Sequence, residues 1–335
     1  MRIAVDAMGG DFAPAEIVKG SVEAGRRFSH IPRIFLVGDE TAIRKELDAL
    51  GDVPSSIEIV HASEVVDMGE APAAAIRKKK DSSISRSVDL VKEGKADAVF
   101  SAGSTGAAVA ASTLKLRTLQ GVGRPAIAVV IPTPTTPCVL VDAGANTDCP
   151  PEWLCQFAVM GAAFARAILK RENPSVGLLN IGEEDAKGNE TTKETFRRLE
   201  KSTLNFKGNI ESRDIFDGKV DVALCDGFVG NVVLKTSEAV ARTMGRWIKT
   251  ELTRNAFIKV GAAIVKSGMD RIKEKADPET YGGAPLLGVN GVCIIGHGSS
   301  SSVAVCNAIR VSAEWVQQNI NHDIEETVKQ FETVS

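Results

Sequence analysis

The sequence AVFSAGSTGAAVAA, residues 98–111, decides the predicted fold of this chain. Residues 98–100 read as an apolar strand, residues 101–106 as a turn of small residues, and residues 107–111 as the start of an apolar helix. Such a turn leaves N–H groups unpaired at the helix start, where the helix dipole adds partial positive charge. No side chain larger than threonine would keep an anion from the backbone. Two readings stay open: an anion site, or a tight turn that binds nothing.

The same pattern, an apolar strand followed by a small polar loop with glycine, recurs along the chain. Ligands bind beyond the carboxyl ends of the strands in an open parallel α/β sheet. We therefore expect the loops to form one shared polar floor, and we expect the functional site on that floor. The further loops are DAMGGD (6–11), DAGAN (142–146), NIGEE (180–184), CDGFVGN (225–231) and GHGSS (296–300).

The order of elements predicts an α/β fold. Alternation of strands and helices over the first 61 residues is typical of a parallel sheet with right-handed crossovers. The chain of 335 residues is long enough for one large α/β unit or two smaller domains, and we expect a single catalytic unit over residues 1–335. Residues 132–137 are interpreted as a turn-rich connector, and residues 281–289 as a Gly/Pro loop.

Residues 229–275 differ from the rest because they read as two helices without a strand between them. From residue 242 to residue 275 there are nine basic and three acidic residues, a local net charge of +6 in a chain of net charge −3. Apolar residues lie between these charges. We expect a basic, amphipathic helical hairpin that protrudes from the body and makes dimer and membrane contacts. The candidate membrane contacts are Leu252, Phe257, Ile258 and Ala262.

Composition excludes several classes of protein. A net charge of −3 and 5% aromatic residues argue against a nucleic-acid surface, so no nucleic-acid partner is expected. Six cysteines without a C-x-x-C pair indicate buried thiols in a reducing compartment, and four histidines without ligand spacing predict no metal site. Because neither a signal sequence nor an apolar run of about 18 residues is present, we expect a cytoplasmic protein, unless its surface holds it to a membrane.

Common catalytic motifs are absent from the sequence. It contains no G-x-S-x-G elbow, no Gly-Lys-Ser/Thr of a P-loop, and no G-x-G-x-x-G after the first strand. What remains is a set of backbone donors with serine, threonine, asparagine and one histidine. Such a set suits the binding of a phosphate-like anion and the stabilisation of a developing oxyanion.

Seven motifs, in order over the whole chain, resemble the phosphate acyltransferase family of bacterial phospholipid synthesis (PlsX). The resemblance implies that inorganic phosphate attacks the thioester of a long-chain acyl-acyl carrier protein, giving acyl phosphate and free carrier protein without a cofactor. It also implies a homodimer and a three-layer α/β/α sandwich with a mostly parallel sheet, similar to phosphotransacetylases and isocitrate-dehydrogenase-like enzymes. The motifs are DAMGGD, SAGSTGA, VDAGAN, NIGEE, CDGFVGN, GGAPLLGV and GHGSS.

The candidate site residues fit this chemistry. His297 is our candidate for polarising the carbonyl or assisting the departing thiolate, and a buried core histidine is the alternative. Asp226 and Asn231 are candidates for orienting His297 or the phosphate, although Asp226 could equally cap the following helix. The candidate phosphate- and substrate-binding residues are Ser101, Gly103, Ser104, Thr105, Gly106, Asn180, Gly182, Gly298 and Ser299.

Other functions and other uses of the hairpin stay open. Acyl transfer from coenzyme A thioesters and a non-catalytic module that binds a phosphorylated metabolite are the competing functions. Acyl phosphate is lipid-like, and its next acceptor enzyme, a glycerol-3-phosphate acyltransferase, is expected in the membrane. We therefore expect peripheral membrane binding at the hairpin tip, residues 257–262. The hairpin could instead form the dimer interface or receive the acidic carrier protein.

Overall fold

The computed structural model describes residues 1–276 and 282–334. Within them, eleven strands form one sheet, in the order β3-β2-β1-β4-β11-β10-β5-β6-β9-β7-β8. The strands are β1 (Arg2–Asp6), β2 (Arg33–Gly38), β3 (Ile57–His61), β4 (Ala98–Ser101), β5 (Ala126–Ile131), β6 (Cys138–Val141), β7 (Ser175–Leu179), β8 (Asn205–Ile210), β9 (Val222–Leu224), β10 (Ala284–Leu287) and β11 (Val292–Ile295).

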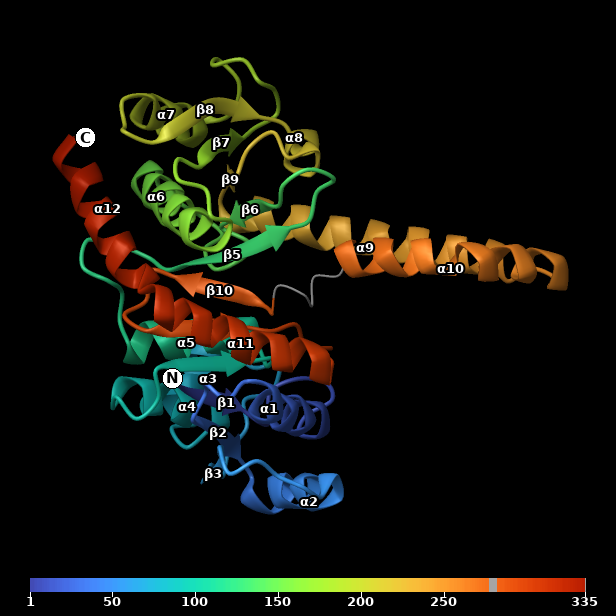
Figure 1. Ribbon diagram of the computed structural model, residues 1–335. Helices are drawn as coiled ribbons and strands as arrows, with labels where there is room; N and C mark the ends of the chain where they lie inside the picture. Colours follow the sequence, from blue (N-terminus) through green and yellow to red (C-terminus); the bar gives the residue numbers. More distant parts are fainter. Residues whose placement is uncertain (277–281, 335) are drawn as a thin grey trace.

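Helices connect most of these strands and cover both faces of the sheet (Figure 1). They are α1 (Ala15–Arg27), α2 (Glu40–Leu50), α3 (Pro72–Lys78), α4 (Ser83–Lys92), α5 (Thr105–Lys115), α6 (Pro151–Ile168), α7 (Glu190–Glu200), α8 (Ser212–Asp217), α9 (Gly227–Leu252), α10 (Ala256–Ala276), α11 (Ser302–Gln318) and α12 (Ile320–Val334).

The alternation of side chains along β4 shows how the layers are held together. Successive strand residues point to opposite faces of a sheet. Ala98 and Phe100 join the core cluster that α1, α6, α11 and α12 complete. Val99 points the other way, into the cluster with α4, α5 and α8. Because strands buried on both faces need apolar residues at every position, the continuous run 98–100 reads as a central strand.

The direction of the strands reverses in the middle of the sheet. β1, β2, β3, β4 and β11 run parallel to one another. β10 is antiparallel to both β11 and β5, and β5 is antiparallel to β6. β6, β9, β7 and β8 are again mutually parallel. Strands β6, β9, β7 and β8 therefore run opposite to β4, and their carboxyl ends lie at the other edge of the sheet.

The interpretation of residues 281–289 as a loop is wrong where the structure describes it. Residues 284–287 form β10, whereas residue 281 lies outside the described residues. Gly and Pro in this stretch suggested a loop, but backbone pairing with Ile127 and Ile294 makes it a strand. Strand β10 is antiparallel to both of its neighbours, β11 and β5, and so takes part in the reversal of strand direction.

Helices α9 and α10 form the predicted protruding hairpin (Figure 1). The side chains of residues 273–275, which entered the charge count, lie outside the described part of the structure. Near the tip, Leu252, Ile258 and Ala262 are half-buried. The exposed apolar residues there are Phe257 (90% exposed), Val260 (66%) and Ile264 (79%). Among the described helices, none is long and apolar enough to cross a bilayer.

Candidate functional site

Three loops converge where the adjacent strands β1, β4 and β11 end. Gly296 N donates to Ser101 O at 2.8 Å, which joins the loop after β11 to the loop after β4. Asp11 N donates to Gly298 O at 2.7 Å, which joins the loops after β1 and β11. We call these loops, residues 6–11, 101–106 and 296–300, the first loop cluster. It contains the predicted strand-turn-helix and His297 together.

Gly9 allows two of these loops to touch through their backbones. A Cβ atom at Gly9 would lie 2.6 Å from Asp6 Oδ2 and 2.7 Å from Gly103 N. Real Cβ atoms are not found that close to other heavy atoms, so any side chain here would push the loops apart. Gly9 is therefore glycine because two backbones meet at this point.

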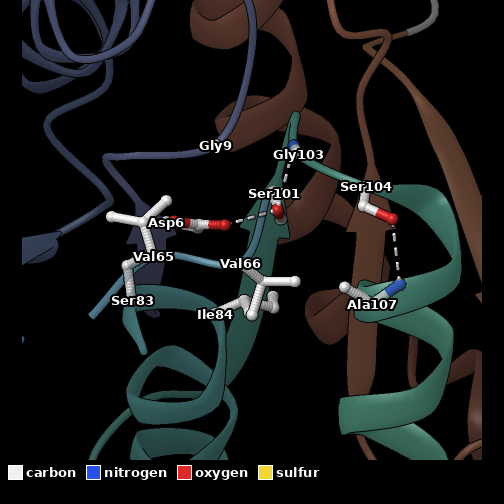
Figure 2. Close-up of a pocket in the computed structure, with 10 residues that line it drawn as sticks. All are labelled: Asp6, Gly9, Val65, Val66, Ser83, Ile84, Ser101, Gly103, Ser104 and Ala107. Atoms are coloured by element: carbon white, nitrogen blue, oxygen red, sulfur yellow. Dashed lines mark hydrogen bonds between the residues drawn. The ribbon is translucent and has the colours of Figure 1, made fainter. Parts of the chain in front are cut away.

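The start of helix α5 offers unpaired donors. Ser104 is the N-cap, and its hydroxyl accepts a hydrogen bond from Ala107 N at 3.4 Å (Figure 2). In the part of the chain that the structure describes, Thr105 N and Gly106 N have no hydrogen-bond partner. Two free N–H groups at a helix start, where the dipole is positive, suit an anion. We call this start, residues 104–106, the cradle.

Ser101 does not offer its hydroxyl proton to a ligand. Its Oγ donates to Asp6 Oδ2 at 2.7 Å and accepts from Gly103 N at 3.2 Å (Figure 2). Ser101, Asp6 and Gly103 line a pocket of about 10 Å³, which has room for about one water molecule. A phosphate ion is too large for this pocket, so an anion of that size could reach the loop only from its outer side.

Gly106 is needed for packing rather than for ligand access. A Cβ atom at this position would lie 2.5 Å from Pro72 Cγ, on helix α3. The missing side chain lets α3 lie against the first turn of α5.

His297 is exposed, which contradicts the alternative of a buried core histidine. Its Nδ1 accepts from Ser299 N at 3.2 Å and lies 2.7 Å from Ser299 Oγ. Because the backbone N–H donates to Nδ1, the neutral ring carries its proton on Nε2. His297 can therefore donate a hydrogen bond from Nε2, with Ser299 holding the ring in place. Gly298 sits between them, and a Cβ there would lie 3.0 Å from Met68 Cε.

A second group of loops follows β6, β7 and β9. Asp142, at the end of β6, is buried and accepts hydrogen bonds from Ile127 N, Gly144 N and Ala145 N at 2.9–3.0 Å. It also accepts from both nitrogens of Asn146, at 2.8 and 2.9 Å. Burial raises the pKa of the Asp142 carboxyl, and these hydrogen bonds oppose the rise. The carboxylate thus organises the loop from inside.

The predicted polar residues of this second loop cluster, residues 142–149, 180–189 and 225–231, are largely used within the protein. Asp226 caps α9, since its Oδ1 accepts from Val229 N at 2.8 Å. Asn180 donates to Lys187 O and to Asn209 Oδ1, both at 3.1 Å. Gly182 is buried beside Glu184, and Asn231 is exposed on α9, close to Gly144. The capping alternative for Asp226 is therefore confirmed.

A cavity of about 820 Å³ opens in the second loop cluster. Cavities for small organic ligands have this size. Its lining includes Asn180, Asp226, Leu178, Ile181 and Val229. Ile181 is 83% exposed and Val229 37% exposed, so the mouth of the cavity is apolar.

The prediction of one shared polar floor is wrong. Ile127 N bonds to Asp142 at the end of β6, and Ala126 pairs with Leu287 at the end of β10. The second loop cluster therefore lies at the edge where β5 and β11 begin, whereas the first lies where β11 ends. Asp226 and Asn231 consequently do not lie beside His297 in this chain, because antiparallel strands separate the two clusters.

Sequence reasoning missed several residues of the first loop cluster. Asp6 was quoted only as part of a loop, yet it is buried and bonded to Ser101. Asp11 lies beside Gly298, the neighbour of His297 in sequence, because a Cβ at Gly298 would be 3.4 Å from the Asp11 carboxylate oxygens. Met68 comes from the segment between β3 and α3 and lies against Gly298, a proximity that no local pattern indicates.

Comparison with known proteins finds relatives that match nearly the whole chain. A family described as "Fatty acid synthesis protein" matches residues 1–323. A phosphate acyltransferase of Desulfitobacterium hafniense is 51% identical over 332 residues, covering 99% of this chain and 98% of the relative. Phosphate acyltransferases of Pelotomaculum thermopropionicum and Akkermansia muciniphila are 49% and 48% identical, and the alignments cover 99% and 100% of this chain and 96% and 97% of theirs.

Solved structures share the fold at low sequence identity. A phosphotransacetylase from Streptococcus pyogenes aligns with a TM-score of 0.61 and 18% identity over 95% of this chain and 94% of its own. A 4-hydroxythreonine-4-phosphate dehydrogenase from Klebsiella pneumoniae aligns with a TM-score of 0.52 and 14% identity, over 95% and 98% of the two chains. The predicted α/β fold with a large, mostly parallel sheet, similar to phosphotransacetylases, is confirmed.

Proposed function

This chain belongs to the Fatty acid synthesis protein family, whose curated relatives are phosphate acyltransferases, and we propose that it transfers the acyl group of a long-chain acyl-acyl carrier protein to inorganic phosphate. The reaction would supply acyl phosphate for phosphatidic acid and phospholipid synthesis. The structural observation that supports this proposal is the pair of free N–H groups at the start of α5, in the same loop cluster as His297.

The residues of the first loop cluster have distinct tasks in this reaction. The N–H groups of Thr105 and Gly106 bind phosphate and place one of its oxygens against the thioester carbon. That oxygen forms the new C–O bond, the carbonyl oxygen becomes an oxyanion, and the C–S bond then breaks. Nε2–H of His297 donates to the oxyanion or to the departing sulfur. Phosphate is itself the nucleophile, so a serine acyl-enzyme is not required.

The reaction is tested by following both products. Purified protein is incubated with palmitoyl-carrier protein and phosphate, and free carrier thiol and hydroxylamine-trapped acyl groups are measured. We expect equal amounts of both, and only when phosphate is present. Thiol release without phosphate would indicate a thioesterase and contradict the proposal.

Two competing functions give different results in the same assay. Palmitoyl-coenzyme A used at a lower kcat/KM than the carrier-protein substrate fits our proposal, whereas a higher value would indicate a phosphotransacetylase-like enzyme. Phosphate binding without turnover of either donor would indicate a non-catalytic module. The solved phosphotransacetylases share only the fold, so the donor must be decided by this assay.

We also propose that the whole chain acts as one catalytic unit. One sheet and one core cluster run through both halves, from Ile3 on β1 to Leu224 on β9. A cut between the halves would expose this shared core. The hairpin α9–α10 is the part that leaves the body.

A homodimer is proposed from the exposed apolar strip on α9. Val232 is 50% exposed, Val240 57%, Met244 47% and Trp247 64%. Their spacing of three, four and eight residues places them on one side of the helix. The 820 Å³ cavity opens beside this strip, since Val229 belongs to its lining. A second copy packed on the strip would cover apolar surface that an isolated chain exposes to water.

The hairpin tip is proposed to bind the membrane surface reversibly. Phe257, Val260 and Ile264 are exposed apolar side chains, and Lys259 and Lys266 lie between and beside them on the same helix. Apolar burial combined with basic residues, each worth about 1 kcal/mol near anionic lipid, suits a peripheral contact. This contact would hold the enzyme near a membrane-bound glycerol-3-phosphate acyltransferase that consumes its product. Basic residues nearer the hairpin base remain available to the acidic carrier protein.

A further inference from the structure

Asp6 is a buried carboxylate directly beneath the loop that leads to the cradle. It ends strand β1 and is 3% exposed. Ser101 Oγ donates to its Oδ2 at 2.7 Å (Figure 2). Met8 N donates to its Oδ1 at 3.3 Å. Gly9 N donates to the backbone carbonyl of Asp6 at 3.4 Å, and Ser83 lines the same small pocket as Asp6. Burial raises the pKa of Asp6, and the polar groups of Ser83, Ser101, Met8 and Gly9 oppose the rise.

The polar groups around this carboxylate come from three segments of the chain. Ser101 belongs to β4, Ser83 to α4, and Met8 and Gly9 to the loop after β1. An ionised carboxylate has two oxygens with about four acceptor positions, so it can accept from Ser101 Oγ and Met8 N at once. An amide has one acceptor oxygen, and its nitrogen would meet donors. The site is therefore built for a carboxylate.

Ser101 connects this carboxylate to the cradle. Its single proton is given to Asp6, which leaves the oxygen to accept Gly103 N at 3.2 Å. Gly103 directly precedes the N-cap Ser104, so the orientation of its peptide sets where α5 begins. If Ser101 were free to rotate, it could release Gly103 N and change the direction of the two free N–H groups.

We propose that Asp6 is a positioning residue for phosphate: it fixes Ser101, and through Ser101 and Gly103 it fixes the N–H groups of Thr105 and Gly106. The inference rests on the proposed function, which places phosphate at the cradle. In this proposal Asp6 does not contact phosphate, because Asp6 is 3% exposed and the pocket that it lines, of about 10 Å³, has room for about one water molecule only.

A double-mutant cycle tests this chain of contacts. The dissociation constant of inorganic phosphate is measured by calorimetry for the parent, Asp6→Asn, Ser101→Ala and the double variant, without an acyl donor. We expect each single substitution to weaken binding roughly tenfold, and the double variant to bind no worse than either single one, because both remove the same constraint. Additive losses, or unchanged binding in Asp6→Asn, would overturn the proposal.

Asp97→Asn is the matched control. Asp97 joins the same two strands at their opposite ends, where its Oδ2 accepts from Arg2 N at 2.7 Å. We expect this substitution to lower thermal stability without changing phosphate binding. An equal loss of phosphate affinity in Asp97→Asn would mean that Asp6 acts only by holding the strands together.

Two further measurements keep the test decisive. Ser83→Ala removes a hydroxyl that lines the same pocket as Asp6 and does not lead to the cradle, and it should change phosphate affinity less than twofold. If Asp6→Asn fails to fold, a Ser101→Ala variant that is stable and still binds phosphate like the parent overturns the inference. Parent protein that binds phosphate but turns over no acyl donor would disprove the proposed function and leave the cycle interpretable.

Discussion

At the scale of single residues, His297 is a polar side chain that the fold leaves exposed. Its ring contacts Ser299 and is outside the core, so removing it should cost little stability. We expect His297→Ala to lower kcat by about 10²–10³, the usual loss for one oxyanion donor. The test measures kcat and the melting temperature of His297→Ala and of the parent on the same preparations. A fall in melting temperature that accounts for the lost activity would contradict a catalytic role.

Gly106 gives the opposite case, a residue of the cradle whose main role is packing. Alanine normally stabilises a helix relative to glycine by up to about 1 kcal/mol. Here the added Cβ would lie 2.5 Å from Pro72 Cγ, so we expect Gly106→Ala to destabilise the protein by about 1–3 kcal/mol instead. Denaturant unfolding measures this loss. Pro72→Ala in the same chain should restore most of it, and no restoration would rule out the clash as the cause.

At the scale of elements, Asp226 belongs to helix α9 as its N-cap. We expect Asp226→Ala to reduce the free energy of unfolding by about 0.5–2 kcal/mol, the usual loss for a removed cap. Asp226→Ser keeps a capping oxygen and should retain most of that stability. Turnover per folded molecule should stay near that of the parent in both variants. An Asp226→Ala variant that is stable but inactive would show that Asp226 has a catalytic role and is not only a helix cap.

The hairpin tip contains two kinds of apolar residue that the sequence could not separate. Phe257 is 90% exposed, whereas its neighbour Ile258 is half-buried. We expect Phe257→Glu to weaken co-sedimentation with anionic vesicles while leaving helix content and activity in solution unchanged. Ile258→Glu should instead loosen the hairpin and reduce helix content. Undiminished vesicle binding by Phe257→Glu at low and moderate salt would show that the tip does not touch lipid.

At the scale of the whole molecule, the apolar strip on α9 decides the oligomeric state. Trp247 is 64% exposed in the single chain, which is unusual for so large an apolar side chain unless a partner covers it. We expect Trp247→Glu combined with Val240→Glu to convert a dimer into a monomer. Sedimentation equilibrium measures the change. A dimer that persists with both substitutions would place the interface elsewhere.

The sequence alone was sufficient for what depends on neighbouring residues. The apolar run 98–100, the small residues 101–106 and the apolar residues 107–111 predicted a strand, a turn and a helix, because these patterns depend on residues close together in the sequence. The spacing of charged and apolar residues likewise predicted the α9–α10 hairpin. Motifs spread over the whole chain identified the family.

Only the tertiary structure decided which loops meet. A loop after a strand looks the same in sequence whichever way that strand runs. The sequence therefore predicted, wrongly, that Asp226 and His297 lie on one shared polar surface. One signal was present: the connector 132–137 is too short for a parallel crossover, which takes a dozen or more residues, and it forces β6 to turn back on β5. The contact of Ser101 with Asp6, 95 residues away, and the position of Pro72 against Gly106 had no such signal. Those contacts depend on how the sheet and helices pack, which no local pattern contains.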